Sequence, residues 1–324
     1  MSKKTILLIH TGGTISMKMS AETGAVVQNE QNPLTAEKHT LATYANIIEV
    51  EAFNLPSPHI TPNEMLRLRN CIAEHVDKYA IDGVVITHGT DTLEETAYFL
   101  DLTTRYNFPI VLTGAMRSSN ELGADGVYNL VEAVRVACSQ EARGKGVLVV
   151  MNDEIHHAFN ITKTSTSSVN TFQSPQYGPI GLITKKTVHI HHMPVQRQFV
   201  EVEKIEKRVA LLKAYAGMEA DLIDAVATLQ YDGLVLEGFG QGNVTPAVAQ
   251  RLKALVANGM PVILVSRCFN GIAEGVYGYE GGGKQLEDAG VIFATGINGQ
   301  KARLKLLIGL NQVHHPVELR AFFS

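Results

Sequence analysis

The sequence predicts an α/β protein with a larger N-terminal domain, built on a mostly parallel sheet flanked by helices, and a smaller C-terminal α/β domain. Two observations favour this class. Short apolar, β-branched runs alternate with longer helical patterns, as in sheets whose parallel strands are joined by right-handed helical crossovers. The chain of 324 residues also exceeds the roughly 250–300 residues at which a single hydrophobic core stops growing.

Five apolar runs of the first domain are predicted to be strands, with three helices between them. The strands are expected at 6–9, 46–52, 83–87, 110–113 and 146–151. The helices are expected at 62–79, 92–104 and 125–138. Thr61-Pro62-Asn63-Glu64 is typical of a helix start, because it offers a capping hydroxyl, a proline at the first helical position and an acid in the first turn.

After Gly181 the composition changes, and a second alternating block follows. We predict an N-terminal catalytic domain over 1–190, a polar linker over 191–208 and a C-terminal domain over 209–324. Strands of the second domain are expected at 209–215, 233–237, 261–266 and 291–295. Its helices are expected at 219–229, after Pro246, and finally from Gln300 onward.

Charge and cysteine content narrow the classes of partner. The 28 Lys and Arg residues against 32 Asp and Glu residues give a net charge of -4, so no basic field for nucleic acid is present and a small molecule is favoured. Cys71, Cys138 and Cys268 fit no zinc or disulfide spacing, which suits a reducing cytosol. The apolar run at 6–9 is too short for a signal peptide or a membrane span. We expect a cytoplasmic chain without membrane association; the alternative is a chain from which a leader was removed.

Two threonine motifs follow predicted strands directly. Thr11-Gly12-Gly13-Thr14 follows the run at 6–9, and His88-Gly89-Thr90-Asp91-Thr92 follows the run at 83–87. Glycines allow a close backbone approach to a ligand, and open α/β sheets bind ligands at their carboxyl edge. We therefore expect Thr14, Thr90 and Asp91 at one edge of the sheet. A plain turn at the first motif, and a helix cap at Asp91, are the alternatives.

Lys163 lies in the run Thr162-Lys163-Thr164-Ser165-Thr166. Together with Thr14, Thr90 and Asp91 it completes a set of side chains that could carry out nucleophilic catalysis. Threonine is a poor nucleophile unless a base removes its proton and nearby dipoles receive the developing charge. If burial near polar groups makes Lys163 less basic, it can activate Thr90, while Asp91 can hold a substrate ammonium. A single lysine is more often solvated in a loop, so this interpretation depends on the combination with the threonine motifs.

Together these segments resemble the bacterial L-asparaginases of the asparaginase/glutaminase family. The resemblance covers nearly the whole chain and rests on Thr11-Gly12-Gly13-Thr14-Ile15, the run 86–100, Val149-Val150-Met151-Asn152-Asp153, Thr162-Lys163-Thr164, Leu112-Thr113-Gly114-Ala115-Met116-Arg117, Gly240-Gln241-Gly242-Asn243 and Gln300-Lys301-Ala302-Arg303. It implies hydrolysis of L-asparagine to L-aspartate and ammonia. It also implies a homotetramer and no metal or organic cofactor.

The resemblance implies catalytic roles for four residues. Thr14 would be the nucleophile, forming a β-aspartyl ester that water then hydrolyses. Thr90, Asp91 and Lys163 would form a second cluster, in which Lys163 and Thr90 handle protons and Asp91 binds the substrate's α-ammonium. The sequence leaves open whether Thr14 or Thr90 attacks first.

Four further residues would contact the substrate. Ser57 would bind its α-carboxylate, and the backbone around Ala115 would meet its side-chain amide. Asn243 and Glu280 would reach into the site of a neighbouring subunit. These assignments, too, are what the resemblance implies.

Two departures from the family pattern stand out. Family members usually place a tyrosine in a mobile N-terminal loop as partner of the first threonine, whereas the stretch 15–28 here contains none. Tyr44, a neighbouring subunit's side chain, or the Lys163 cluster alone could replace it. Beside Ser57, where periplasmic-type relatives carry a glutamine, this chain has Pro58, which removes a donor and stiffens the pocket wall. We therefore expect weak or no glutaminase activity.

Two other functions compete with this interpretation. The amidohydrolase subunit of a tRNA-dependent amidotransferase shares the domain pair but normally carries an extra N-terminal region, whereas here the threonine motif begins at Thr11. A non-catalytic amino-acid sensor could dispense with Lys163 and one threonine, and this chain has them all.

The remaining polar motifs receive structural interpretations. His156-His157, His189-Ile190-His191-His192 and His314-His315 are expected to be exposed rather than to bind metal, because no acid or cysteine accompanies the central tract. Arg117 and Arg135 are expected to make structural or interface pairs.

Overall fold

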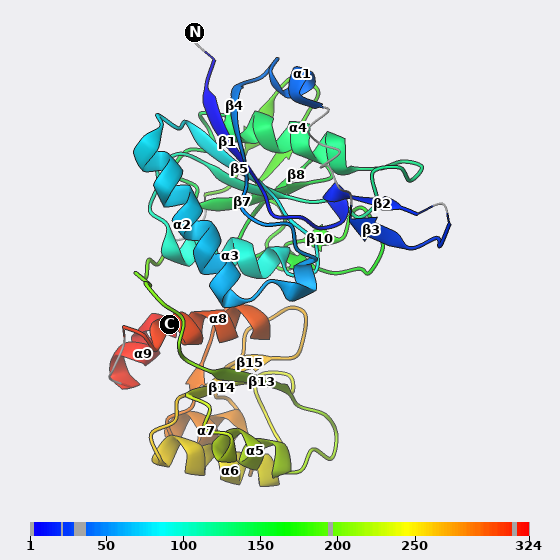
Figure 1. Ribbon diagram of the computed structural model, residues 1–324. Helices are drawn as coiled ribbons and strands as arrows, with labels where there is room; N and C mark the ends of the chain where they lie inside the picture. Colours follow the sequence, from blue (N-terminus) through cyan, green and yellow to red (C-terminus); the bar gives the residue numbers. More distant parts are fainter. Residues whose placement is uncertain (1–2, 21, 29–36, 194–196, 313–315, 324) are drawn as a thin grey trace. The chain divides into compact units, whose positions relative to one another are not determined.

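The computed structural model describes residues 3–20, 22–28, 37–193, 197–312 and 316–323. Its contacts divide the chain into two compact units, Met1–Phe199 and Val200–Ser324. Each unit is a sheet covered by helices (Figure 1), so the predicted fold class is confirmed.

An eight-stranded sheet forms the centre of the first unit, with the order β12-β11-β8-β7-β6-β5-β1-β4. Five neighbouring strands are parallel: β4 (Asn46–Glu51), β1 (Thr5–His10), β5 (Gly83–Thr87), β6 (Ile110–Thr113) and β7 (Val147–Met151). Antiparallel strands β8 (Glu154–His157), β11 (Gly181–Ile183) and β12 (Val188–Ile190) complete it. Every residue of β5 is buried, which explains its uninterrupted apolar run.

Helices cover both faces of this sheet. α2 (Pro62–Lys78) and α3 (Leu93–Thr103) lie on one face, and α1 (Lys38–Leu41) and α4 (Gly126–Ala137) on the other (Figure 1). α2 begins as predicted, because Thr61 and Glu64 form a capping box around Pro62. Apolar side chains of α4 and of the sheet form one buried cluster that includes Leu130, Val134, Val85, Val111 and Leu148.

Several short elements were not predicted. β2 (Met17–Met19) and β3 (Val26–Gln28) form a hairpin, and β9 (Thr162–Lys163) and β10 (Phe172–Gln173) form another two-stranded sheet. Two 3-10 turns, Thr14–Ser16 and Ser57–His59, follow β1 and β4. Elements of two or three residues contain too few side chains for a periodic pattern to be recognised.

The second unit contains a parallel sheet of order β13-β14-β15-β16. Its strands are β13 (Val209–Lys213), β14 (Gly233–Gly238), β15 (Val262–Ser266) and β16 (Ile292–Phe293). α5 (Asp221–Thr228), α6 (Pro246–Ala257) and α7 (Gly283–Asp288) lie on one face, and α8 (Gly299–Gly309) on the other (Figure 1). The prediction that the helix near Gln300 is the last one is wrong, because α9 (Pro316–Phe323) follows it.

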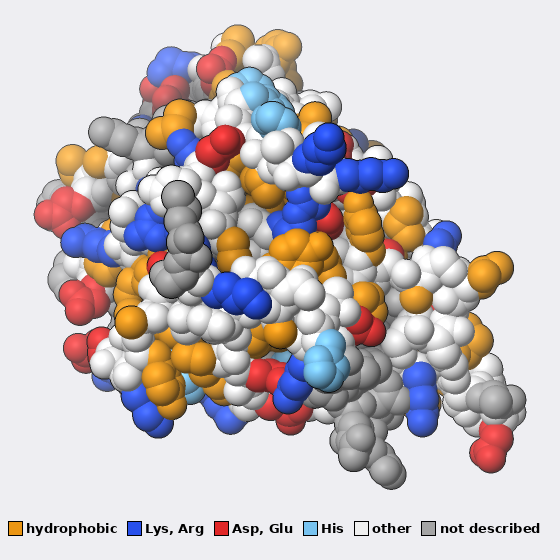
Figure 2. Space-filling model, turned by 90° about the horizontal axis from the view of Figure 1, so that it is seen from above, with side chains coloured by type: hydrophobic (Ala, Val, Ile, Leu, Met, Phe, Trp, Pro, Cys, Tyr) orange, Lys and Arg blue, Asp and Glu red, His pale blue; other side chains and the backbone are white. Residues whose placement is uncertain are grey.

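On the face in Figure 2, Lys and Arg side chains are interspersed with Asp and Glu side chains, so that this face carries no field of a single sign. None of the helices in the described part of the chain is long and apolar enough to cross a bilayer.

Candidate active site

Four parallel neighbouring strands deliver predicted site residues to one edge of the sheet. The register places His10 of β1 beside Thr87 of β5, and Thr87 beside Thr113 of β6, so these strands end together. Shortly after the ends of β1, β4, β5 and β6 come, respectively, Thr14, Ser57, the pair Thr90 and Asp91, and Ala115. The parallel sheet thus brings five chemically useful positions to its carboxyl edge.

Two glycines let the threonine loops touch backbone to backbone. A side-chain carbon on Gly13 would lie 2.2 Å from the Gly89 Cα, and one on Gly89 would lie 2.7 Å from the Ser57 Oγ. Gly13 adopts φ 86° and ψ 178°, a conformation that is essentially restricted to glycine. The loop of Thr14 therefore packs directly against the loop of Thr90, which in turn packs against Ser57.

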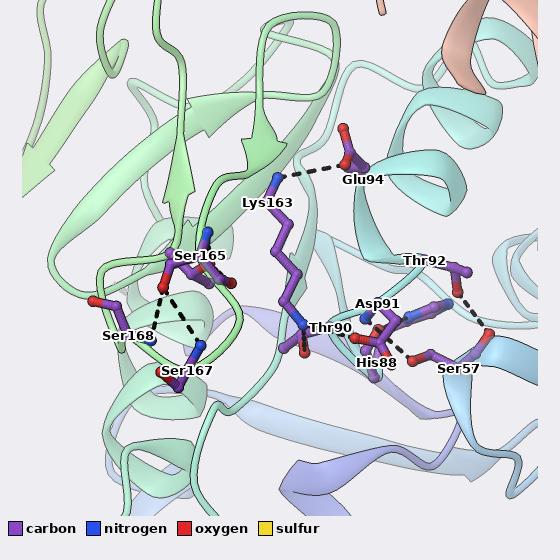
Figure 3. Close-up of polar contacts among 12 residues, drawn as sticks. Ser57, His88, Thr90, Asp91, Thr92, Glu94, Lys163, Ser165, Ser167 and Ser168 are labelled. Atoms are coloured by element: carbon purple, nitrogen blue, oxygen red, sulfur yellow. Dashed lines mark hydrogen bonds and ion pairs between the residues drawn. The ribbon is translucent and has the colours of Figure 1, made fainter. Parts of the chain in front are cut away.

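Lys163 joins the cluster from outside the main sheet. Its Nζ lies 2.9 Å from the Thr90 Oγ1 and 2.7 Å from the Asp91 Oδ1 (Figure 3). The Lys163 side chain is 17% exposed and the Asp91 side chain 58%. The alternative of a solvated loop lysine is therefore wrong. The alternative of Asp91 as a helix cap is wrong as well, because Thr92 is the N-cap of α3.

Ser57 is tied to the same loop by two hydrogen bonds. The Asp91 N–H donates to the Ser57 Oγ at 3.2 Å, and the Thr92 hydroxyl donates to the Ser57 carbonyl at 2.9 Å (Figure 3). A serine hydroxyl that accepts one bond still has its own proton to donate. The Ser57 hydroxyl can thus serve as a donor to an anionic group beside the exposed Asp91 carboxylate.

His88 is a residue whose role the sequence did not reveal. It is fully buried, and this burial lowers its pKa to about 4, so the ring is neutral. Its Nδ1 lies 2.8 Å from the Gly89 carbonyl oxygen and its Nε2 2.9 Å from the Thr96 Oγ1. A carbonyl can only accept, so Nδ1–H donates to it, and Nε2 accepts from the Thr96 hydroxyl. His88 therefore anchors the turn that carries Thr90.

The turn that carries Ala115 is shaped by the start of α4. The Asp125 carboxylate accepts hydrogen bonds of 3.0 Å from the Met116 and Arg117 N–H groups. Asn129 donates to the Gly114 carbonyl at 3.0 Å. Ala115 itself is buried, so its contribution to a ligand would come from its backbone. Asp125 and Asn129 gave no signal in the sequence beyond their place near a helix start.

The two predicted arginines make structural contacts. Arg117 donates through Nη1 to the Gly123 carbonyl at 2.9 Å. Arg135 forms a 2.9 Å ion pair with Glu132 and donates to the Thr184 carbonyl. These contacts lie within the first unit and agree with the structural interpretation.

Asn243 and Glu280 belong to the second unit. The Asn243 Oδ1 accepts from the Gly283 N–H at 3.1 Å, which leaves its NH2 group as the donor. Glu280 is exposed and accepts from Gln250 at 3.3 Å. Their reach into a neighbouring subunit stays a prediction. Tyr44 precedes β4 at the amino edge of the first sheet, opposite Thr14, so it cannot partner the Thr14 of its own chain.

The histidine motifs differ in their burial. His156 and His157 are buried, and His156 bonds to Ser174 and Glu154, so the prediction that this pair is exposed is wrong. His189 is exposed and bonds to Thr187, whereas His314-His315 lies outside the described residues. Within the described ranges, no group of three or more His, Cys, Asp or Glu side chains could hold a metal ion.

Comparison with known proteins extends these observations to both units. Residues 5–196 match the family model described as asparaginase, N-terminal, and residues 208–323 match the glutaminase/asparaginase C-terminal domain. The chain is 39% identical to a probable L-asparaginase of Deinococcus radiodurans, over 98% of this chain and 97% of that protein. It is 34% identical to L-asparaginase 2 of Escherichia coli (strain K12), over 98% of this chain and 92% of that protein.

A solved structure shows the same fold along the chain. The crystal structure of a probable cytoplasmic L-asparaginase from Campylobacter jejuni matches with a TM-score of 0.89 and 32% identity, over 99% of both chains. Family models, relatives and fold thus agree with the motifs at the sheet edge. The chain therefore belongs to the asparaginase/glutaminase family of amidohydrolases.

Proposed function

We propose that this protein hydrolyses L-asparagine to L-aspartate and ammonia through an ester formed on Thr14. One observation carries the proposal: the Lys163 Nζ lies within hydrogen-bond reach of Thr90 and Asp91. The loop that carries Thr90 and Asp91 packs backbone to backbone against the loop of Thr14. A nucleophile, a proton carrier and a carboxylate thus meet at one sheet edge. The names of the relatives support asparagine as the substrate.

Thr14 is the nucleophile in this proposal. Its hydroxyl has no hydrogen-bond partner among the described residues, and the residue is partly exposed. The Thr14 Oγ1 attacks the carboxamide carbon and loses its proton, and the amide nitrogen gains a proton and leaves as ammonia. Water then attacks the ester carbon, which releases aspartate and restores the threonine hydroxyl. Lys163 and Thr90, whose Nζ and Oγ1 atoms lie 2.9 Å apart, relay protons during these transfers.

The substrate's charged ends give Asp91 and Ser57 their roles. One Asp91 oxygen is bound to Lys163, and the exposed remainder of the carboxylate can hold the α-ammonium. The Ser57 proton can be donated to the α-carboxylate. The backbone near Ala115 meets the side-chain amide. Pro58, in the 3-10 turn Ser57–His59, stiffens the wall beside this group, and we expect it to disfavour the longer glutamine.

Assembly and location complete the proposal. A homotetramer would allow Asn243 and Glu280 to complete a neighbouring site, with the Asn243 NH2 group left to donate. A cytoplasmic location is supported by the free cysteines Cys71, Cys138 and Cys268, which suit a reducing compartment, and by the cytoplasmic relative from Campylobacter jejuni.

The deciding experiment measures ammonia release from L-asparagine and L-glutamine side by side. We expect turnover of asparagine, much slower turnover of glutamine, and a loss of about three orders of magnitude in kcat for Thr14→Ala. Thr23→Ala removes a threonine hydroxyl from the exposed turn of the β2–β3 hairpin, which follows the 3-10 turn of Thr14, and is the matched control.

Three results would contradict the proposal. Undiminished turnover in folded Thr14→Ala would exclude the nucleophile. Asparagine binding without ammonia release would indicate a sensor, and dependence on a tRNA partner would indicate an amidotransferase subunit.

A further inference from the structure

The strand that carries Lys163 lies outside the eight-stranded sheet. β9 consists of Thr162 and Lys163 alone and pairs with β10 in a two-stranded sheet separate from the eight-stranded one. An isolated pair of short strands is marginally stable at best. A direct contact between β9 and the segment that follows β5 would fix the position of Lys163 relative to Thr90.

Glu94 supplies such a contact. It lies in the first turn of α3, and its Oε1 accepts from the Thr162 hydroxyl at 3.1 Å. The same oxygen accepts from the Lys163 N–H at 3.4 Å (Figure 3). Glu94 is only 5% exposed. A buried carboxylate is costly unless it is hydrogen-bonded, and the N-terminus of α3 favours its negative charge. Glu94 is therefore in a position to hold β9 firmly.

Both ends of Lys163 are anchored to one short segment. Thr90 and Asp91 bind its amine, and Glu94, three residues after Asp91, binds its backbone N–H. Figure 3 shows the extended side chain stretched between these two attachments. A lysine side chain has four flexible methylenes, so fixing its backbone end restricts the positions that its amine can reach.

We propose that Glu94 is a positioning residue of this site: it sets Lys163 at the distance from Thr90 that proton transfer needs, without touching the substrate. This inference rests on the proposed function and deepens it. A misplacement of about 1 Å in a catalytic group can cost roughly a hundredfold in rate. The loss should appear mainly in kcat, because Glu94 is not among the groups proposed to bind the substrate.

The test combines Glu94 and Lys163 variants in a double-mutant cycle, with ammonia release as the readout. Glu94→Ala should lower kcat about a hundredfold and change KM little. In a Lys163→Met background the same substitution should change the residual rate by less than about twofold, because Glu94 acts through Lys163. Glu94→Gln retains an acceptor oxygen and should recover most of the lost rate.

A purely structural role for Glu94 predicts a different pattern. It predicts the same fractional loss in both backgrounds, and that result would overturn the inference, as would near wild-type kcat in Glu94→Ala. If Glu94→Ala does not fold, Thr162→Val removes one of the two bonds and undergoes the same cycle, with an expected loss of about tenfold only when Lys163 is present. Wild-type turnover in Lys163→Met would instead overturn the proposed function, and this inference with it.

Discussion

Replacing Gly13 with alanine tests the contact on which the site depends. The added carbon would lie 2.2 Å from the Gly89 Cα and 2.4 Å from the Gly89 N, whereas carbon atoms in contact normally lie about 3.5–4.0 Å apart. The threonine loops must therefore separate by more than about 1 Å, which alone can cost about a hundredfold in rate. The glycine-only backbone conformation adds about 1–3 kcal/mol of destabilisation.

The assay is steady-state ammonia release from L-asparagine, together with thermal unfolding. We expect kcat/KM of Gly13→Ala to fall at least about a hundredfold. Gly24→Ala is the matched control, because Gly24 also has a positive φ of 68° but no atom within 4 Å of the added carbon. A folded Gly13→Ala protein with wild-type kcat/KM would refute the reasoning that the two loops must touch.

Three further predictions concern catalysis, stability and assembly. Lys163→Met should lower kcat by several orders of magnitude in steady-state assays. Lys18→Met, on an exposed part of β2, is the control and should leave kcat unchanged. Equal kcat values for the two variants would contradict the proton-transfer role of Lys163. Burial lowers the pKa of Lys305 from 10.5 to about 8, so the free energy of unfolding should rise as the pH rises from about 8 to 10.5. A shift of one pKa unit corresponds to 1.36 kcal/mol, so Lys305→Met should raise the free energy of unfolding at pH 7 by at most about 3 kcal/mol, as measured by denaturant titration. The increase should be smaller near pH 10, and no increase at pH 7 would contradict the prediction. Activity should fall on dilution to monomers, because Asn243 is proposed to complete a neighbouring site; a fully active monomer by light scattering would exclude this role.

The sequence alone located the parallel strands of both sheets, the longer helices and the sheet edge at which the candidate site lies. Strand β5 is buried along its whole length. A strand that is buried on both faces of a parallel sheet needs an uninterrupted apolar run, and for this reason the run at 83–87 predicts the strand. The start of α2 is equally predictable from the sequence, because its capping box joins residues only three positions apart. Thr14 and Thr90 could be located at strand ends for the same reason: strand and loop are adjacent along the chain.

Only the tertiary structure decided which distant side chains meet and which polar groups are buried. Lys163 and Thr90 are 73 residues apart, and no local pattern states that their side chains lie within 2.9 Å. The bonds of Glu94 to β9 and of His88 to Thr96, and the burial of His156 and His157, likewise depend on the packing of whole elements. A polar residue's environment is set by the elements that fold around it, and these lie elsewhere in the chain.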